Sequence, residues 1–249
     1  MTTSNSTADS TPATLRSPIL LAFAVVAVVH VLLNALDLTP WNSITKCLLA
    51  PLLVAWVLQQ RGPKLIAVAL VCFFFGDLFL EIEDLFLLGM AAFAIGHVCF
   101  VTFFVQRGAL DRLKGNPLIV AALVVAAGAT IALVWTGLEP ELRVPVLVYS
   151  LLLSTTGATA LATDARAGLG AVLFLVSDAV IALGLADRIE EGGIISTIGI
   201  MPLYILAIFL LATATTFREQ RSRDVVAQGW DPTRRTDCWP TVPAKGADR

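Results

Sequence analysis

Eight long apolar stretches constrain this chain more than any other feature. They lie near residues 18–36, 43–60, 64–81, 85–106, 117–136, 144–163, 168–186 and 194–216. A helix needs about 20 apolar residues to cross the hydrocarbon core of a bilayer. Hydrophobic residues make up 57% of the chain and charged residues 14%, whereas a soluble domain has about 25% charged residues. We therefore expect an all-α, polytopic membrane bundle of about eight transmembrane helices.

The apolar stretches occupy most of the chain, so no separate soluble module is expected. We predict a disordered polar N-terminus at residues 1–17, a transmembrane bundle at 18–216 and a disordered cytoplasmic tail at 217–249. The first apolar run continues to Leu36, which is too long for an ordinary signal peptide and favours a true span. The cysteines form no Cys-x-x-Cys pair, so neither a disulfide framework nor a zinc site is predicted.

Basic residues divide unevenly between the two sides of such a bundle. If the N-terminus is cytoplasmic, the outer loops hold only Arg143 and Arg188, and the inner side holds Arg16, Arg61, Lys64, Arg107, Arg112, Lys114, Arg166, Arg218, Arg221 and Arg223. Cytoplasmic loops carry the excess of Lys and Arg in membrane proteins. The pattern predicts an even number of spans in a cell membrane, with both termini in the cytoplasm. The outer loops are acidic instead, with Asp37, Glu81, Glu83, Asp84, Glu139, Glu141, Asp187, Glu190 and Glu191.

Two aspartates stand inside predicted spans, Asp77 in the third and Asp178 in the seventh. An ionisable group in a membrane is costly, so each is a candidate functional residue. Both spans run outward, and the helical rise puts Asp77 about 20 Å and Asp178 about 15 Å above the inner ends. We expect the two side chains to face a common interior cavity in the outer half of the bundle. Other polar side chains expected to converge there are Lys46, His97, Tyr149 and Tyr204.

Some of these polar and aromatic residues could instead have a purely structural role. Asp77 could pair with Lys46 only to hold two helices together. His97 could be a packing residue, and the aromatic residues that recur along the fourth span indicate a packed core. A metal site of Asp77, His97 and Asp178 is a further alternative, although neither His-Glu-x-x-His nor an equivalent spacing occurs.

Two aspartates in one sheltered pocket can share a single charge, which leaves one neutral acid and one carboxylate. That pair suits hydrolysis through an oxocarbenium-like state, in which the acid donates a proton and the carboxylate activates water. Acetals, glycosides and enol ethers all break in this way. The alternatives are a proton- or ion-coupled transporter of small molecules or lipids that uses the same Asp, His and Lys groups, and a non-catalytic lipid-binding protein.

An ordered set of short motifs resembles the YhhN, or lysoplasmalogenase, family of multispanning membrane proteins. The motifs are Thr45-Lys46 ahead of Pro51, Gly76-Asp77 before Leu78-Phe79-Leu80, Phe86-x-x-Gly89 leading to Phe93 and Gly96-His97, Tyr149, Gly170-Ala171-Val172-Leu173-Phe174 with Ser177-Asp178, and Tyr204. They cover residues 45 to about 210. The chain departs from the family pattern at Cys47, Phe100 and Ile208, where the family has Pro, Tyr and Gln.

The resemblance implies an alkenyl ether hydrolase of ether lipid metabolism. Such an enzyme cleaves the vinyl ether of lysoplasmalogen, a lysophospholipid, to a fatty aldehyde and a glycerophospho-ethanolamine or -choline. Asp77 and Asp178 would be the catalytic aspartate dyad, and Lys46 would bind the phosphate. The resemblance further implies substrate-orienting hydrogen bonds from His97, Tyr149, Ser177 and Tyr204. No metal, cofactor or nucleic acid partner is expected; the partners are the lysophospholipid substrate and membrane lipid.

Overall fold

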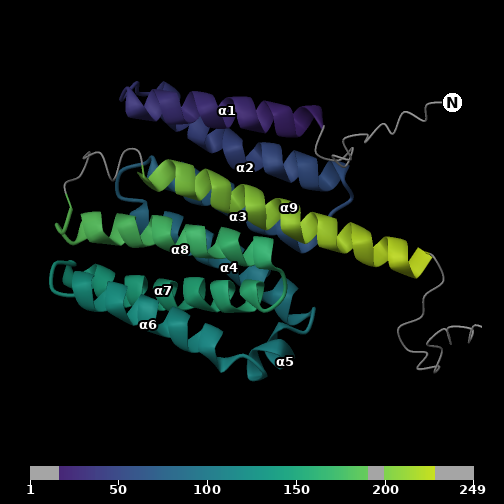
Figure 1. Ribbon diagram of the computed structural model, residues 1–249. Coiled ribbons are helices and arrows are strands. Elements are labelled where there is room, and N and C mark those ends of the chain that lie inside the picture. The colour runs from purple at the N-terminus through teal and green to yellow at the C-terminus, as the bar shows by residue number, and fades with distance from the viewer. Residues whose placement is uncertain (1–16, 190–198, 228–249) are drawn as a thin grey trace, which may run out of the picture.

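The computed structural model describes residues 17–189 and 199–227, in which all regular structure is helical. The helices are α1 (Pro18–Ala35), α2 (Trp41–Gln59), α3 (Lys64–Leu80), α4 (Phe86–Val105), α5 (Ala109–Lys114), α6 (Pro117–Val134), α7 (Pro140–Leu161), α8 (Ala165–Leu185) and α9 (Ile200–Ala227). The long helices lie side by side in one bundle, with α1 and α6 at opposite edges (Figure 1). The predicted all-α bundle is confirmed.

Seven of the described helices are long and apolar enough to cross a membrane. The eighth long helix, α3, has 17 residues and lies at the lower limit of length for a span. The chain is therefore an integral, multi-pass membrane protein. The start of α1 and the end of α9 lie at the same end of the bundle (Figure 1), as an even number of long helices requires. Which side of the membrane this end faces stays a prediction.

The two ends of the bundle carry different connections between helices. The terminal end holds the start of α1, the end of α9, and the α2–α3, α4–α6 and α7–α8 connections. The cavity end holds the α1–α2, α3–α4 and α6–α7 connections, the end of α8 and the start of α9. The short helix α5, within the α4–α6 connection, was not predicted.

Several helices begin where the sequence carries a start signal. Ser17 caps α1, because its hydroxyl oxygen accepts the backbone N–H of Ile19, and Pro18 follows at the first helical position. The carboxylate of Asp164 caps α8 by accepting the backbone N–H groups of the second and third residues after it. Prolines also open α6 and α7. These caps satisfy N–H groups that have no partner within the helix.

Part of the acidity of the cavity end comes from turn geometry. Asp37, Asp84 and Asp187 each adopt a positive φ, of 50°, 67° and 54°, in the turns after α1, α3 and α8. Aspartate tolerates this left-handed conformation better than most residues do. These three charges are therefore explained by backbone turns. Glu190 and Glu191 lie outside the described residues.

Helices α3 and α4 approach closely because glycines face aromatic rings across their interface. A Cβ atom on Gly76 would lie 2.6 Å from the ring of Phe93, and one on Gly96 would lie 2.5 Å from the ring of Phe73. Small residues permit such approach between membrane helices. The aromatic stripe of α4 is buried and packs on Phe73 and Phe174, so the prediction of a packed core there is confirmed.

The last helix corrects the predicted tail boundary. Instead of ending near residue 216, α9 continues to Ala227, so residues 217–227 are helical. Side chains in this extension bond to backbone carbonyls at the ends of α2 and α7: Arg218 to Thr163, Gln220 to Gln60 and Arg223 to Arg61. The polar composition of the extension does not reveal these partners. Residues 1–16 and 228–249 lie outside the described part.

Candidate active site

A cavity of about 220 Å³ lies between α2, α3, α4, α6, α7, α8 and α9, towards the cavity end. Most of its lining is apolar. The polar side chains in its wall are Lys46, Asp77, Thr130, Tyr149, Ser150, Ser177, Asp178 and Tyr204. Six of the seven site residues predicted from the sequence are therefore brought to one cavity. The exception is His97.

The first aspartate is held by a tyrosine from the last helix. Asp77 projects from the last turn of α3, towards the cavity end, and is 1% exposed. The hydroxyl of Tyr204, on α9, donates a hydrogen bond of 2.6 Å to Oδ2 of Asp77. Tyr204 is itself buried, and its ring packs edge-to-face on Phe93 and Phe174. Aromatic packing thus fixes the donor that orients this carboxyl group.

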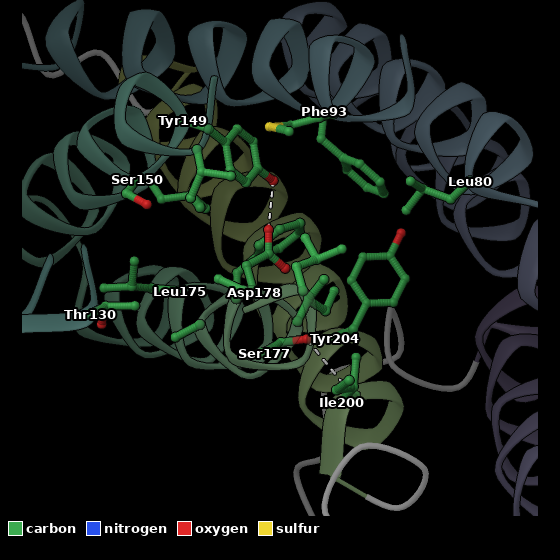
Figure 2. A pocket seen from close by; sticks show the side chains of 18 of the residues that line it. Leu80, Phe93, Thr130, Tyr149, Ser150, Leu175, Ser177, Asp178, Ile200 and Tyr204 are labelled. Carbon is green, nitrogen blue, oxygen red and sulfur yellow. Dashed lines mark hydrogen bonds between the residues drawn. The ribbon is translucent and has the colours of Figure 1, made fainter. Parts of the chain in front are cut away.

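The second aspartate has the same kind of partner from a different helix. The hydroxyl of Tyr149, on α7, donates a hydrogen bond of 2.6 Å to Oδ2 of Asp178, on α8 (Figure 2). Asp178 lies between Tyr149 and Tyr204 in this view. Tyr149 and Tyr204 are the only two tyrosines of the chain. Both tyrosines therefore donate a hydrogen bond to an aspartate of the cavity.

The two carboxyl groups form separate pairs with tyrosine, and they are not bonded to each other among the hydrogen bonds of residues 17–189 and 199–227. No hydrogen bond of the described residues involves the second oxygen, Oδ1, of either carboxyl group. Asp77 and Asp178 thus line one cavity, as predicted, and each forms its own pair with a tyrosine.

Lys46 forms an ion pair with Glu81, and not with Asp77, the structural partner considered from the sequence. Its Nζ lies 2.7 Å from Oε1 of Glu81, one helical turn beyond Asp77 on the chain. Burial acts to raise the pKa of Glu81, but the nearby ammonium outweighs burial and holds the pKa below its usual value. The idea that Lys46 pairs with Asp77 is therefore corrected. Glu81 takes the ion pair because it lies outside the apolar wall, where Lys46 can reach it.

His97 lies behind the cavity wall. Its ring is fully buried and packs edge-on against Phe174, with centroids 4.5 Å apart, and against Tyr149, with centroids 6.1 Å apart. Neither ring nitrogen has a hydrogen-bond partner within the described residues. The structure therefore places His97 in the aromatic packing that supports Tyr149, rather than among the groups that face the cavity.

Ser177 is in the wall but its hydroxyl is turned to the backbone. It donates a hydrogen bond of 3.2 Å to the carbonyl of Ile200, the first residue of α9 (Figure 2). This bond joins α8 to the start of α9. Because Tyr204 follows one turn later on α9, Ser177 helps to set the position from which Tyr204 reaches Asp77.

No group of three or more His, Cys, Asp or Glu side chains in the described ranges is arranged to hold a metal ion. The trio considered from the sequence is not brought together, since Asp77 and Asp178 line the cavity and His97 lies behind Tyr149.

Sequence reasoning missed three contributors to this region. Ser150 and Thr130 line the cavity, and only their place beside or near other polar residues could have marked them. His30 is 1% exposed in α1, and its Nδ1 contacts the carbonyl of Asn42 at 3.1 Å. His30 lies in an apolar span, as His97 does, so the reasoning that singled out His97 could also have singled out His30.

Polar and apolar side chains are mixed around the cavity. Lys46 and Asp77, from α2 and α3, line it together with Leu80. The helices α6, α7 and α8 contribute apolar residues as well as polar ones, among them Ala127, Thr130, Leu153 and Leu175. Figure 2 shows Asp178 between Thr130 and Leu175 on one side and Tyr204 and Leu80 on the other. Asp178 therefore has both polar and apolar neighbours in the wall.

Comparison with known proteins identifies relatives. The chain is 35% identical over 150 residues to the protein named lysoplasmalogenase TMEM86B of Homo sapiens, a match that covers 59% of this chain and 64% of the relative. It is 32% identical over 151 residues to the protein of the same name in Rattus norvegicus, with 59% and 62% covered. The chain thus spans just under two thirds of the length of these curated relatives. No solved structure matches it.

A family model gives the broader assignment. The model of the YhhN family matches residues 41–215, which is more than two thirds of the chain. The matched range contains every residue that lines the cavity, from Lys46 to Tyr204. The resemblance seen in the motifs is confirmed, and the chain belongs to the YhhN family.

Proposed function

We propose that this protein is a membrane-embedded hydrolase that cleaves the vinyl ether bond of lysoplasmalogen-type lysophospholipids. The products are a fatty aldehyde and a glycerophospho-base. The observation that carries the proposal is the pair of aspartates at one cavity, each oriented by a tyrosine and each with one oxygen left for the substrate. The names of the curated relatives support the same activity.

The reaction needs one acid and one base, and Asp77 and Asp178 supply both. The protonated aspartate transfers its proton to the β-carbon of the enol ether, and the electron pair of the ether oxygen forms an oxocarbenium ion. The ionised aspartate stabilises this cation and then takes a proton from water, whose oxygen bonds to the cationic carbon. The hemiacetal then breaks its bond to the glycerol oxygen, which takes the proton that the second aspartate removed from water. The hemiacetal hydroxyl gives its proton to the first aspartate, and its oxygen becomes the carbonyl of the aldehyde. One water is consumed and both aspartates return to their starting states.

The two tyrosines orient the acids during these steps. A hydroxyl donor on Oδ2 holds each carboxyl group in one rotamer and directs Oδ1 towards the cavity, so the acid and the base stay aimed at the same bond. Positioning of this kind lowers the barrier because the reacting groups are ordered before the reaction begins. The tyrosines are positioning residues in this scheme, and the aspartates are the catalytic ones.

The shape of the cavity suggests how a lysolipid would lie. A volume of about 220 Å³ is below the roughly 300–1,000 Å³ of pockets that enclose a whole ligand. We infer that only the vinyl ether and the adjoining glycerol are enclosed. The phosphate would lie at Lys46, and the apolar chain would leave along Ala127 and Leu153 towards α6, an edge helix of the bundle (Figure 1).

Aldehyde release by the purified protein tests the proposal. The substrates are matched lysolipids with a vinyl ether, a saturated ether or an ester at the same position. We expect aldehyde only from the vinyl ether, and no effect of EDTA. Asp77→Asn and Asp178→Asn should each lower turnover by about 10²–10⁴-fold, the usual range for an acid or base. Asp111→Asn, at an exposed site on α5, is the control and should keep wild-type turnover.

Two outcomes would contradict the proposal. Substantial turnover in either aspartate variant would remove that residue from its role. Solute flux into sealed liposomes without aldehyde release would favour the transporter alternative instead. The comparisons give that alternative no support, because the curated relatives are named as lysoplasmalogenases, and α3 and α8, which carry the aspartates, run without interruption.

A further inference from the structure

The ion pair of Lys46 and Glu81 lies beside the cavity. Lys46 lines the cavity and its side chain is 17% exposed, whereas the side chain of Glu81 is 29% exposed and belongs to the turn after α3. Going outward from the carboxyl group of Asp77, the charges therefore come in the order of cation and then anion. The pair is reachable both from the cavity and from the surface.

A zwitterionic lysophospholipid presents the complementary order of charges. Its phosphate follows the glycerol, and its ammonium group follows the phosphate. With the vinyl ether at Asp77, the phosphate falls beside the ammonium of Lys46 and the headgroup nitrogen falls beside the carboxylate of Glu81. The protein ion pair and the headgroup thus carry their charges in complementary order, so that the two pairs can exchange partners.

We propose that the Lys46–Glu81 pair selects lysolipids with a zwitterionic headgroup. On binding, the phosphate replaces Glu81 on Lys46, and the headgroup ammonium replaces Lys46 on Glu81. The inference rests on the proposed function for the placement of the vinyl ether at Asp77. Glu81 becomes a specificity-determining residue that sequence reasoning did not single out for binding.

The exchange is feasible because neither protein charge is left without a counter-charge. A partly exposed ion pair contributes little to stability, so opening it costs little. A headgroup that ends in phosphate alone would satisfy Lys46 but would leave Glu81 facing an additional negative charge. Like charges brought together in this way disfavour the wrong ligand. Glu81 therefore acts mainly by excluding anionic headgroups.

The surroundings favour the cationic part of the headgroup at this position. Glu83 and Asp84 lie in the same turn as Glu81 and are exposed. His30 lies within electrostatic reach of both members of the ion pair. Its Nδ1 lies 3.1 Å from the carbonyl oxygen of Asn42 and 3.0 Å from Oγ1 of Thr45, and its buried Nε2 has no partner in the part of the chain that is described. The turn after α3 thus presents three exposed carboxylates, those of Glu81, Glu83 and Asp84.

Binding of lipids that cannot be cleaved tests the inference. The probes are 1-O-alkyl-glycerophosphoethanolamine and 1-O-alkyl-glycero-3-phosphate, which share a saturated ether and differ in the headgroup. Their Kd values are measured by calorimetry in detergent for the wild type, Glu81→Gln and Glu83→Gln. Glu83 is the matched control, because it lies in the same turn and takes part in none of the ion pairs of the described residues.

We expect the wild type to bind the ethanolamine lipid more tightly. Glu81→Gln should reduce the ratio of the two affinities on the order of tenfold, because it loses the ammonium contact and frees Lys46 for the phosphate lipid. Glu83→Gln should change the ratio by less than about twofold, as a screened surface charge does. An unchanged ratio in Glu81→Gln would overturn the inference.

A structural role for Glu81 would show itself differently. Glu81→Asp keeps the charge and should recover part of the headgroup preference, with an unfolding temperature close to that of the wild type. If Glu81→Asp and Glu81→Gln lose the preference equally and both unfold at lower temperature, the pair is a structural contact and the inference is overturned. The probes carry no vinyl ether, so a wild type that selects headgroups but releases no aldehyde contradicts only the proposed hydrolysis.

Discussion

At the terminal end of the bundle, several charged side chains pair with one another and with backbone carbonyls, whereas at the cavity end two aspartates line a cavity, each with a tyrosine as partner. Glu219 on the α9 extension pairs with both Arg107 and Arg223. Arg107 also lies 3.5 Å above the ring of Phe103 and donates to its carbonyl. These contacts join α9 to the end of α4.

The cavity end follows the opposite pattern. Among the described residues, Asp77 and Asp178 each accept a single hydrogen bond, although a carboxylate can accept several. The difference shows that burial alone does not mark a site. What distinguishes the cavity end is that two aspartates inside the bundle line a cavity there.

The largest effect after the aspartates themselves is expected at the tyrosines. Tyr149→Phe and Tyr204→Phe keep the ring packing and remove only the donor to each carboxyl group. Each should lower kcat by about 10–100-fold, the equivalent of about 1.5–3 kcal/mol for a hydrogen bond to a charged group. Thr130→Val removes a hydroxyl that lines the cavity but bonds to its own helix. That control should stay within about twofold of the wild type.

A spectroscopic measurement checks the same two bonds directly. Because the chain has two tyrosines, labelling with 3-fluorotyrosine should give two ¹⁹F resonances, both from the site. Each Tyr→Phe variant should remove one resonance, and Asp77→Asn should shift the Tyr204 resonance more than the Tyr149 resonance. Equal kcat in the wild type and both Phe variants would show that the tyrosines do not position the acids.

A smaller effect, on stability alone, is expected at the terminal end. Glu219→Gln removes the carboxylate shared by Arg107 and Arg223. We expect a loss of about 1 kcal/mol, or about 2–4 °C in Tm for a chain of this size, with turnover unchanged. Asp111→Asn breaks an exposed pair with Lys114 and should leave Tm unchanged. A tenfold fall in turnover in Glu219→Gln would mean that the two ends are coupled.

Another small effect is expected at His97, between the two ends. His97→Leu keeps most of the buried volume and removes two nitrogens that make no hydrogen bond in the described structure. The change in unfolding free energy should be below about 1.5 kcal/mol, as for other swaps that conserve volume. Turnover should stay within about threefold. A loss of more than tenfold in a folded variant would contradict this and return His97 to the site as a functional residue.

Much of the site could be predicted because it contains ionisable and polar residues that are rare in membrane spans. Asp77 and Asp178 stand out against apolar neighbours, and the helical rise alone put them at similar depth. The chain order of the motifs then resembled the YhhN family, which the family model confirms. The even number of long helices followed from the loop charges, which are a property of the sequence.

The partners of these residues could not be predicted in the same way. From the sequence, Lys46 was a possible partner of Asp77. In the structure, Lys46 pairs with Glu81, and Tyr204 donates a hydrogen bond to Asp77. Which side chain meets which depends on how each helix is rotated about its axis, and a rotation of one residue turns a side chain by about 100°. Hydropathy does not fix that angle when a span is apolar on all sides.

The sequence by itself determined that this chain spans a membrane many times and that its helices are apolar throughout. It also showed that two aspartates within the spans require an explanation. These conclusions follow from the cost of placing polar groups in lipid. The tertiary structure decided which groups face the cavity. Close packing at Gly76 on Phe93 sets α3 against α4, and the bond from Ser177 to Ile200 sets the start of α9. These contacts turn Asp77 and Tyr204 towards each other and leave His97 behind the wall, because packing between helices fixes their rotation.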